Sequence, residues 1–133
     1  FDEQHYLRIR LETEAFNLIL SRVKKGDYKL LVSPVHIKEI EAVPDVFERI
    51  ELKTILDKLG EPIKVNLDKT RKRAEELVKS GFGIADAAHV AFAEQVRAQF
   101  ISCDDALVKK CLKHNIKVWC GNPIAFCDKE DLR

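Results

Sequence analysis

The sequence contains no methionine, no apolar run long enough to cross a bilayer and no signal-peptide pattern at its start. Because translation begins at methionine, we expect the natural chain to have further residues upstream of Phe1. The absence of a membrane-spanning run and of a leader favours the cytoplasm. For the same reason, we do not expect a membrane among the partners of this chain.

A strong net charge is absent as well, because 23 basic and 22 acidic residues leave a formal charge of +1. Any contact with nucleic acid must therefore come from a local basic cluster and not from the charge of the whole chain. The 133 residues are enough to bury a core, and no linker-like stretch or internal repeat divides them. We expect a single domain over residues 1–133.

The four cysteines lack the spacing of a zinc site. There is no C-x-x-C pair, and the intervals between Cys103, Cys111, Cys120 and Cys127 match no common zinc module. Three of them stand beside apolar residues, as reduced cysteines in a protein core do. We therefore expect structural, reduced thiols.

Helical patterns alternate with short apolar runs along the chain. Helices are expected over residues 4–25, 34–43, 45–59, 68–80, 84–99 and 105–114, with a last helical turn over 122–126. Strands are expected over residues 28–33, 62–67, 100–103 and 116–120. Strands that alternate with helices favour an α/β fold, in which helices cover both faces of a parallel sheet.

Start and stop signals bound these helices. Ser33, Asp45, Asp68 and Asp104 each stand where an N-cap residue is expected, and Pro34 occupies a favoured first helical position. The helix over 45–59 should stop at a glycine, and Gly-Phe-Gly should end the helix over 68–80 before the next helix starts at residue 84.

In such folds, ligands bind at the carboxyl ends of the strands. This rule selects three acidic residues as candidates for a functional site. Asp104 ends the strand over 100–103, Glu39 lies on the helix that leaves the first strand, and Asp86 stands among alanines. Carboxylates brought together repel one another, and a divalent cation relieves the repulsion. Mg²⁺ and Mn²⁺ favour oxygen ligands, and such a site can activate water and stabilise the leaving oxygen of a phosphodiester.

Each of these residues also has a simpler interpretation. Asp104 alone is more often a helix cap, and Glu39 alone is more often a solvated surface residue. His89 either orients Asp86 or contacts substrate, or it is a packed, hydrogen-bonded histidine; His36, which precedes Glu39, has the same alternatives. The basic clusters over 71–73 and 109–113 either contact phosphates or form solvated helix faces.

Four stretches carry a resemblance to a known family. "VSPVHIKEIE" is similar to a strand followed by S-x-x-x-x-x-E, which ends at Glu39, and "GIADAAHVAFA" to a D-A-x-H-x-A helix that begins with Asp86. "FISCDDALVKK" looks like a strand that ends in [S/T]-x-D at Asp104, and "IKVWCGNPIAF" like a final strand and Asn-Pro turn. In this order and spacing they resemble the PIN domains, metal-dependent nucleases that include VapC-like toxins.

The resemblance implies a three-layer α/β/α PIN-like domain that acts as a Mg²⁺- or Mn²⁺-dependent endoribonuclease. Its catalytic and metal-binding residues would be Glu39, Asp86 and Asp104. Ser102 and His89 are the candidate substrate contacts, and for Ser102 the alternation along the strand equally allows a buried side chain. The family's first strand, which supplies a further acid, has no counterpart here and is expected upstream of residue 1. The resemblance also implies an RNA substrate, a homodimer and an antitoxin protein as partner.

Two rival hypotheses belong to other classes of protein. The first is a catalytically inactive PIN-like module that binds RNA or protein after losing its metal site. The second is an unrelated small α/β interaction domain in which Glu39, Asp86 and Asp104 are caps or surface residues that lie far apart.

Overall fold

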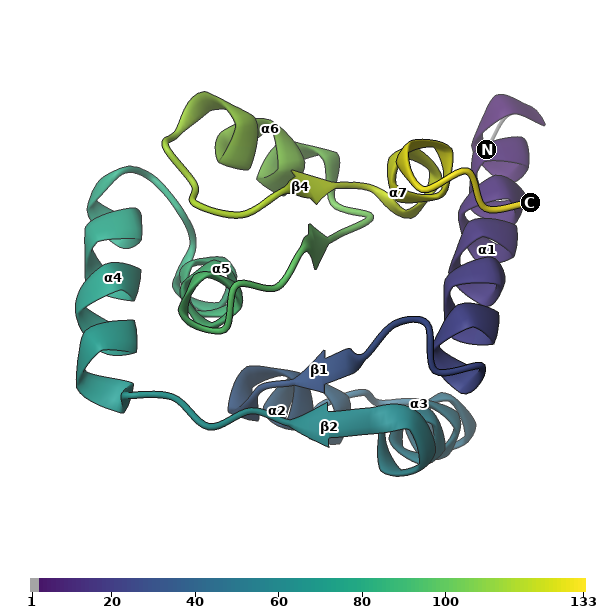
Figure 1. Ribbon diagram of the computed structural model, residues 1–133, viewed down its shortest axis with the longest axis horizontal. Coiled ribbons are helices and arrows are strands. Elements are labelled where there is room, and N and C mark those ends of the chain that lie inside the picture. Colours follow the sequence, from purple (N-terminus) through teal and green to yellow (C-terminus); the bar gives the residue numbers. More distant parts are fainter. Residues whose placement is uncertain (1–2) are drawn as a thin grey trace. The chain divides into compact units, whose positions relative to one another are not determined.

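The computed structural model describes residues 3–133, which form two compact units (Figure 1). The first unit comprises the chain up to Tyr28 together with Gln99–Asn115 and Trp119–Arg133. The second comprises Lys29–Ala98 and Ile116–Val118. The single domain expected over residues 1–133 stays a prediction.

Helix packing forms the core of the first unit. Its elements are α1 (Glu3–Lys24), β3 (Phe100–Ile101), α6 (Asp105–Lys113), β4 (Cys120–Gly121) and α7 (Pro123–Lys129). Ala15 and Ile19, one turn apart on α1, are buried with Phe126 and Cys127 where α7 packs on α1 (Figure 1). The ring of Trp119 adds an edge-to-face contact, with its centroid 5.7 Å from that of Phe126.

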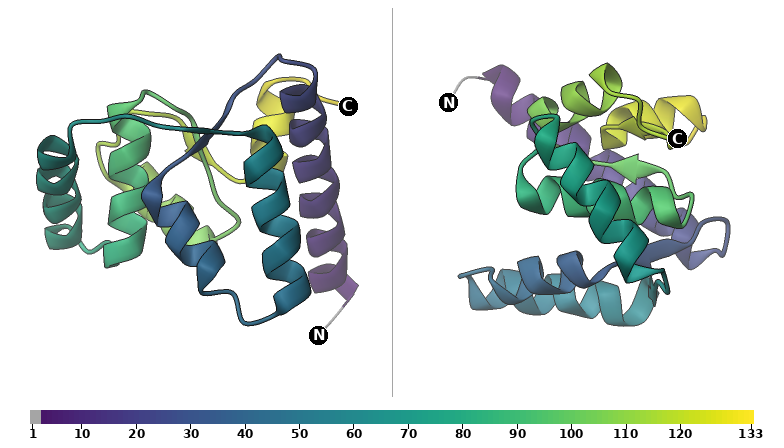
Figure 2. Two further views of the ribbon diagram at one scale, coloured as in Figure 1. Left: turned by 90° about the horizontal axis from the view of Figure 1, so that it is seen from below. Right: turned by 90° about the vertical axis from the view of Figure 1, so that its left-hand side faces the viewer.

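The second unit is also built mainly from helices. Its elements are β1 (Leu30–Val32), α2 (Pro34–Glu41), α3 (Val46–Leu59), β2 (Gly60–Pro62), α4 (Leu67–Lys79) and α5 (Ile84–Gln95). Figure 2 shows α4 and α5 side by side. Leu77 of α4 and Ala87, Val90 and Ala91 of α5 are buried. The small alanine side chains of α5 let the two helices approach closely.

The three-layer α/β/α fold with one parallel sheet, expected from the sequence, is wrong. Residues 3–133 form seven helices that hold 65% of the chain, about twice the usual share. The strands form two separate two-stranded sheets, β1 with β2 and β3 with β4, both paired in parallel. The apolar runs that suggested strands are short, and periodicity alone does not tell such a run from a buried turn or helix end.

The second strand shows the difference most clearly. It was expected over residues 62–67, but β2 pairs Gly60, Glu61 and Pro62 with Leu30–Val32 and ends there. A Cβ at Gly60 would stand 2.5 Å from Cγ2 of Val32 and 2.6 Å from a carbonyl oxygen of α3. The residue expected only to stop a helix is therefore also the one that lets β1, β2 and α3 meet.

The helix boundaries agree better with the sequence. Asp45 accepts a hydrogen bond from the Glu48 N–H at 3.0 Å, so the expected cap of α3 is confirmed. The expected cap of α4 is wrong: Asn66, and not Asp68, accepts from the Lys69 N–H at 3.1 Å. None of the helices over residues 3–133 is both long enough and apolar enough to span a bilayer.

Candidate functional site

A hydrogen bond between two side chains joins α2 to α5 in the second unit. The Nε2 atom of His89 lies 2.8 Å from Oε1 of Glu39, although 50 residues separate the two in the chain. Because a carboxylate only accepts, Nε2 carries the proton and donates it to Glu39. The His89 side chain is 10% exposed and that of Glu39 is 53% exposed, so the pair lies at the surface with its carboxylate facing solvent.

His36 packs against this pair from α2. Its ring centroid is 4.6 Å from that of His89. The Ser33 backbone N–H donates to Nδ1 of His36 at 3.0 Å, which requires that nitrogen to be unprotonated. Burial, followed by the neighbouring charge of His89, holds the pKa of His36 below its usual value, and Glu39 opposes this only in part. The uncharged form of His36 is thus a part of the folded site.

Asp86 lies in the first turn of α5, one turn before His89. Its side chain is half-buried, and Oδ2 is 3.7 Å from the position that a Cβ on Gly83 would take. The carboxylate is therefore at the N-terminal end of α5, where the helix dipole favours a negative charge. Glu39, Asp86 and His89 lie on α2 and α5, which contact each other, and we call these three residues the α2–α5 acid site.

Asp104 belongs to the first unit, where it caps α6. Its Oδ1 accepts from the N–H groups of Ala106 at 3.0 Å and Leu107 at 3.2 Å, and its own N–H donates to Oγ of Ser102 at 3.1 Å. The cap that the sequence predicted is confirmed. Both bonds use one carboxylate oxygen, so Oδ2 remains open to a further ligand.

Asp105, the next residue, is held differently. Both of its carboxylate oxygens accept from the Arg8 guanidinium, one of them at 2.6 Å. This hydrogen bonding and the charge of Arg8 hold the pKa of Asp105 below its usual value. Asp105 therefore ties α6 to α1 and is not available to a metal ion.

The three predicted acids are divided between the units, with Glu39 and Asp86 in one and Asp104 in the other. Over residues 3–133, no group of three or more His, Cys, Asp or Glu side chains is placed to hold a metal ion. The chemistry of the donors nevertheless fits Mg²⁺ or Mn²⁺, because carboxylate oxygens are the ligands that these ions favour. All four cysteines are free thiols, and three are buried.

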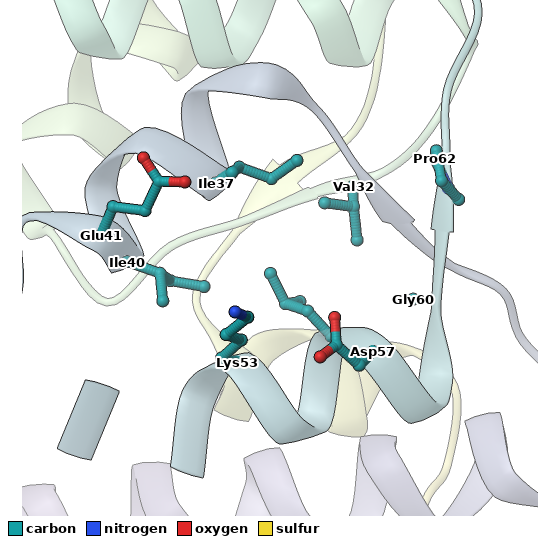
Figure 3. A pocket seen from close by; sticks show the side chains of 9 residues that line it. Val32, Ile37, Ile40, Glu41, Lys53, Asp57, Gly60 and Pro62 are labelled. Atoms are coloured by element: carbon teal, nitrogen blue, oxygen red, sulfur yellow. The ribbon is translucent and has the colours of Figure 1, made fainter. Parts of the chain in front are cut away.

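Two pockets in the second unit were not foreseen from the sequence. The first, of about 210 Å³, is mainly apolar and lies between α2, α3 and the β1–β2 sheet. Figure 3 shows Ile37 and Ile40 of α2 facing Lys53 and Asp57 of α3 across this space. The second, of about 240 Å³, is polar and lies over α4 and α5. No short sequence motif predicts either pocket, because each pocket is lined by residues from several separate elements.

Comparisons with known protein families, with curated protein sequences and with solved structures give no significant match. The likeness of the four sequence stretches to PIN domains therefore stays a prediction. What the α2–α5 acid site offers is an exposed carboxylate oriented by a histidine, beside the helix turn that carries a second carboxylate.

Proposed function

We propose that the chain is a Mg²⁺- or Mn²⁺-dependent endoribonuclease of the cytoplasm, with Glu39, Asp86 and Asp104 as its acids. The observation that carries the proposal is the His89–Glu39 hydrogen bond, which holds an exposed carboxylate of α2 against the helix of Asp86. The free thiols support a reducing compartment. A homodimer and an antitoxin protein as partner belong to the same proposal.

His89 acts in this proposal as a positioning residue. Its Nε2–H holds Oε1 of Glu39, and this bond would orient the Glu39 carboxylate when it binds a cation. Asp86 supplies a second oxygen donor from the start of α5. The cation supplies activation of water and stabilisation of the charge that develops on the phosphodiester. Ser102, whose hydroxyl holds the Asp104 N–H, orients the third acid.

The proposal is tested by replacing Asp86 with Asn, which removes a charge and keeps the shape of the side chain. We expect RNA cleavage to fall by at least about 100-fold, because the loss of a group that merely orients a ligand already costs 10- to 100-fold. Mn²⁺ binding, followed by calorimetry, should be lost in parallel. Circular dichroism should show an unchanged helix content.

Asp68→Asn is the matched control, because Asp68 is 84% exposed and makes only a 3.5 Å ion pair with Arg71. This variant should cleave RNA and bind Mn²⁺ as the unaltered chain does. Cleavage retained by Asp86→Asn, or lost equally in both variants, would contradict the role assigned to Asp86.

A catalytically inactive module that binds protein or RNA is the second candidate. The apolar pocket between α2 and α3 favours it, because exposed Ile37 and the neighbouring Ile40 offer a surface suited to an apolar side chain (Figure 3). This candidate predicts that the unaltered chain shows neither Mn²⁺ binding nor cleavage, even with RNA present. Saturable Mn²⁺ binding that depends on Asp86 would exclude it.

A further inference from the structure

The polar pocket over α4 and α5 is lined by side chains from three segments of the second unit. Its lining residues are Lys69, Lys72, Arg73, Glu76, Glu94, Gln95 and Lys117. Four basic side chains face two acidic ones, so the pocket has a local surplus of two positive charges in a chain whose total is +1. The pocket therefore carries a local positive charge.

Glu94 and Arg73 neutralise each other at the base of the pocket. Arg73 donates from Nε to Oε1 of Glu94 at 2.7 Å and from Nη2 to Oε2 at 3.2 Å. The Lys117 backbone N–H donates to the same Oε2 at 2.8 Å. Arg73 also donates to the exposed Glu76 at 3.0 Å. Arg73 therefore pairs with both acids of the pocket. The positive charge available to a ligand comes from the other basic side chains.

Three ammonium groups remain, those of Lys69, Lys72 and Lys117. All three lysines are exposed, and none of them forms an ion pair within residues 3–133. Lys69 and Lys72 are one turn apart on α4, and the backbone bond to Glu94 fixes the position from which the Lys117 side chain extends. The hydrogen-bonded Arg73–Glu94 pair at the base and the three exposed lysine side chains together form a surface suited to phosphate oxygens.

The surplus is spread over lysine side chains from two segments, α4 and residue 117, and such a spread suits a run of phosphates. One phosphodiester carries a single negative charge, so two neighbouring phosphodiesters match a surplus of two. Glu94 is also about 12 Å further along α5 than Asp86, at 1.5 Å per residue. A strand held at the pocket can therefore reach the α2–α5 acid site within a few nucleotides.

We infer that this pocket binds the phosphodiester backbone of single-stranded RNA next to the position that is cleaved. The inference rests on the proposed function, because it takes RNA as the substrate. Lys69, Lys72 and Lys117 contact phosphates without reading the bases, so binding is independent of sequence and weakens with salt.

The test measures binding without cleavage. The full chain is titrated into a 5′-labelled single-stranded RNA in EDTA, and fluorescence anisotropy is followed between 50 and 200 mM NaCl. We expect the double variant Lys72→Glu, Lys117→Glu to bind at least about 10-fold more weakly, with a salt dependence reduced by about 1 to 2 in slope. Lys72→Gln with Lys117→Gln should show a smaller loss in the same direction, and serves if the reversed charges disturb folding.

Lys64→Glu with Lys79→Glu is the matched control, because it makes the same change in net charge on exposed lysines outside the pocket. This variant should keep the affinity of the unaltered chain to within about twofold. An equal loss in the control and the pocket variant would overturn the inference, since the total charge would then account for binding. Full displacement of RNA by millimolar inorganic phosphate would also overturn it.

The remaining outcomes separate the two proposals. RNA binding that depends on the pocket, in a chain that cleaves nothing with Mn²⁺, supports the pocket and overturns the ribonuclease. Cleavage that depends on Asp86, with equal RNA binding by the pocket variant and the unaltered chain, supports the ribonuclease and overturns the pocket. A chain that neither binds nor cleaves RNA overturns both.

Discussion

Glu94 shows how this chain tolerates a buried charge. Its side chain is 3% exposed and stands in the alanine-rich helix α5, where an isolated carboxylate would be costly. The Arg73 guanidinium and the Lys117 N–H together engage both carboxylate oxygens. The hydrogen bond to Glu94 also raises the pKa of Arg73, so the cation is never lost. Asp86, which also stands among alanines on this helix, is only half-buried.

Replacing Glu94 with Gln should therefore destabilise the chain. We expect a loss of about 2 to 3 kcal/mol in the free energy of unfolding, measured with urea. Breaking a fully buried pair costs about 3 to 5 kcal/mol. The expected loss is smaller because Arg73 is 21% exposed and keeps Glu76 as a partner.

Glu76→Gln is the matched control for this experiment. It removes the other carboxylate that pairs with Arg73, but Glu76 is 66% exposed. Exposed pairs contribute about 0 to 1 kcal/mol, so this variant should stay within about 0.5 kcal/mol of the unaltered chain. Equal effects of the two substitutions would show that burial of the Glu94 pair has no energetic consequence.

At the scale of elements, the start of α4 is a place where the structure differs from the prediction made from the sequence. Asp68 and Asn66 are both good N-cap residues by type, and only the geometry shows which one occupies the position. The Asn66 side chain accepts from the Lys69 N–H, and the backbone carbonyl of Asn66 accepts from the N–H and the hydroxyl of Thr70. Asp68 lies inside the first turn, where its charge interacts with the helix dipole.

Substituting each residue with Ala tests this assignment. Asn66→Ala should cost about 1 kcal/mol, the usual effect of losing a cap. Asp68→Ala should cost about 0.5 kcal/mol or less, because it removes only a dipole interaction and an exposed ion pair. Urea unfolding of both variants gives the comparison. A larger loss for Asp68→Ala would place the start of α4 where the sequence predicted it.

The whole molecule has groups whose protonation opposes folding on the acid side. The pKa of His36 is held below its usual 6.5 by burial, that of Glu130 below 4.5 by Lys129, and that of Asp105 below 3.8 by Arg8. In each case the unfolded chain takes up the proton at a higher pH than the folded chain does. Stability is therefore complete above the unfolded value and is lost as the pH falls below it.

The alkaline side is governed by groups that fold in their protonated form. Burial raises the pKa of Tyr28 and Cys127, and desolvation together with a hydrogen bond to Glu12 raises the pKa of Cys103 to about 11. The unfolded thiols lose their protons near 9.0, before the folded ones do. Stability is therefore complete below about pH 9 and decreases above it.

These directions predict a plateau of stability between about pH 6.5 and pH 9, with a decline on both sides. Urea midpoints measured from pH 4 to pH 10.5 give the profile, and a single domain further predicts one transition at each pH. His36→Gln should flatten the first acid decline, because a glutamine at this position can still accept the Ser33 N–H and does not titrate. An unchanged profile in this variant would contradict the role of His36.

The sequence by itself determined where most helices begin and end. Asp45 and Asp104 cap the expected helices, and Ser33 with Pro34 starts α2, because caps depend on atoms within about four residues along the chain. The same local character made Glu39, Asp86 and Asp104 visible as candidate acids. It did not separate Asn66 from Asp68, since two adequate caps stood two positions apart.

Only the tertiary structure decided which distant residues meet. The bond between Glu39 and His89 spans 50 positions, and that between Arg73 and Glu94 spans 21. The short parallel pairings that replaced the expected single sheet are likewise contacts between distant segments. Such contacts depend on the packing of whole helices, and a periodic pattern specifies which face of an element is buried but not what covers it.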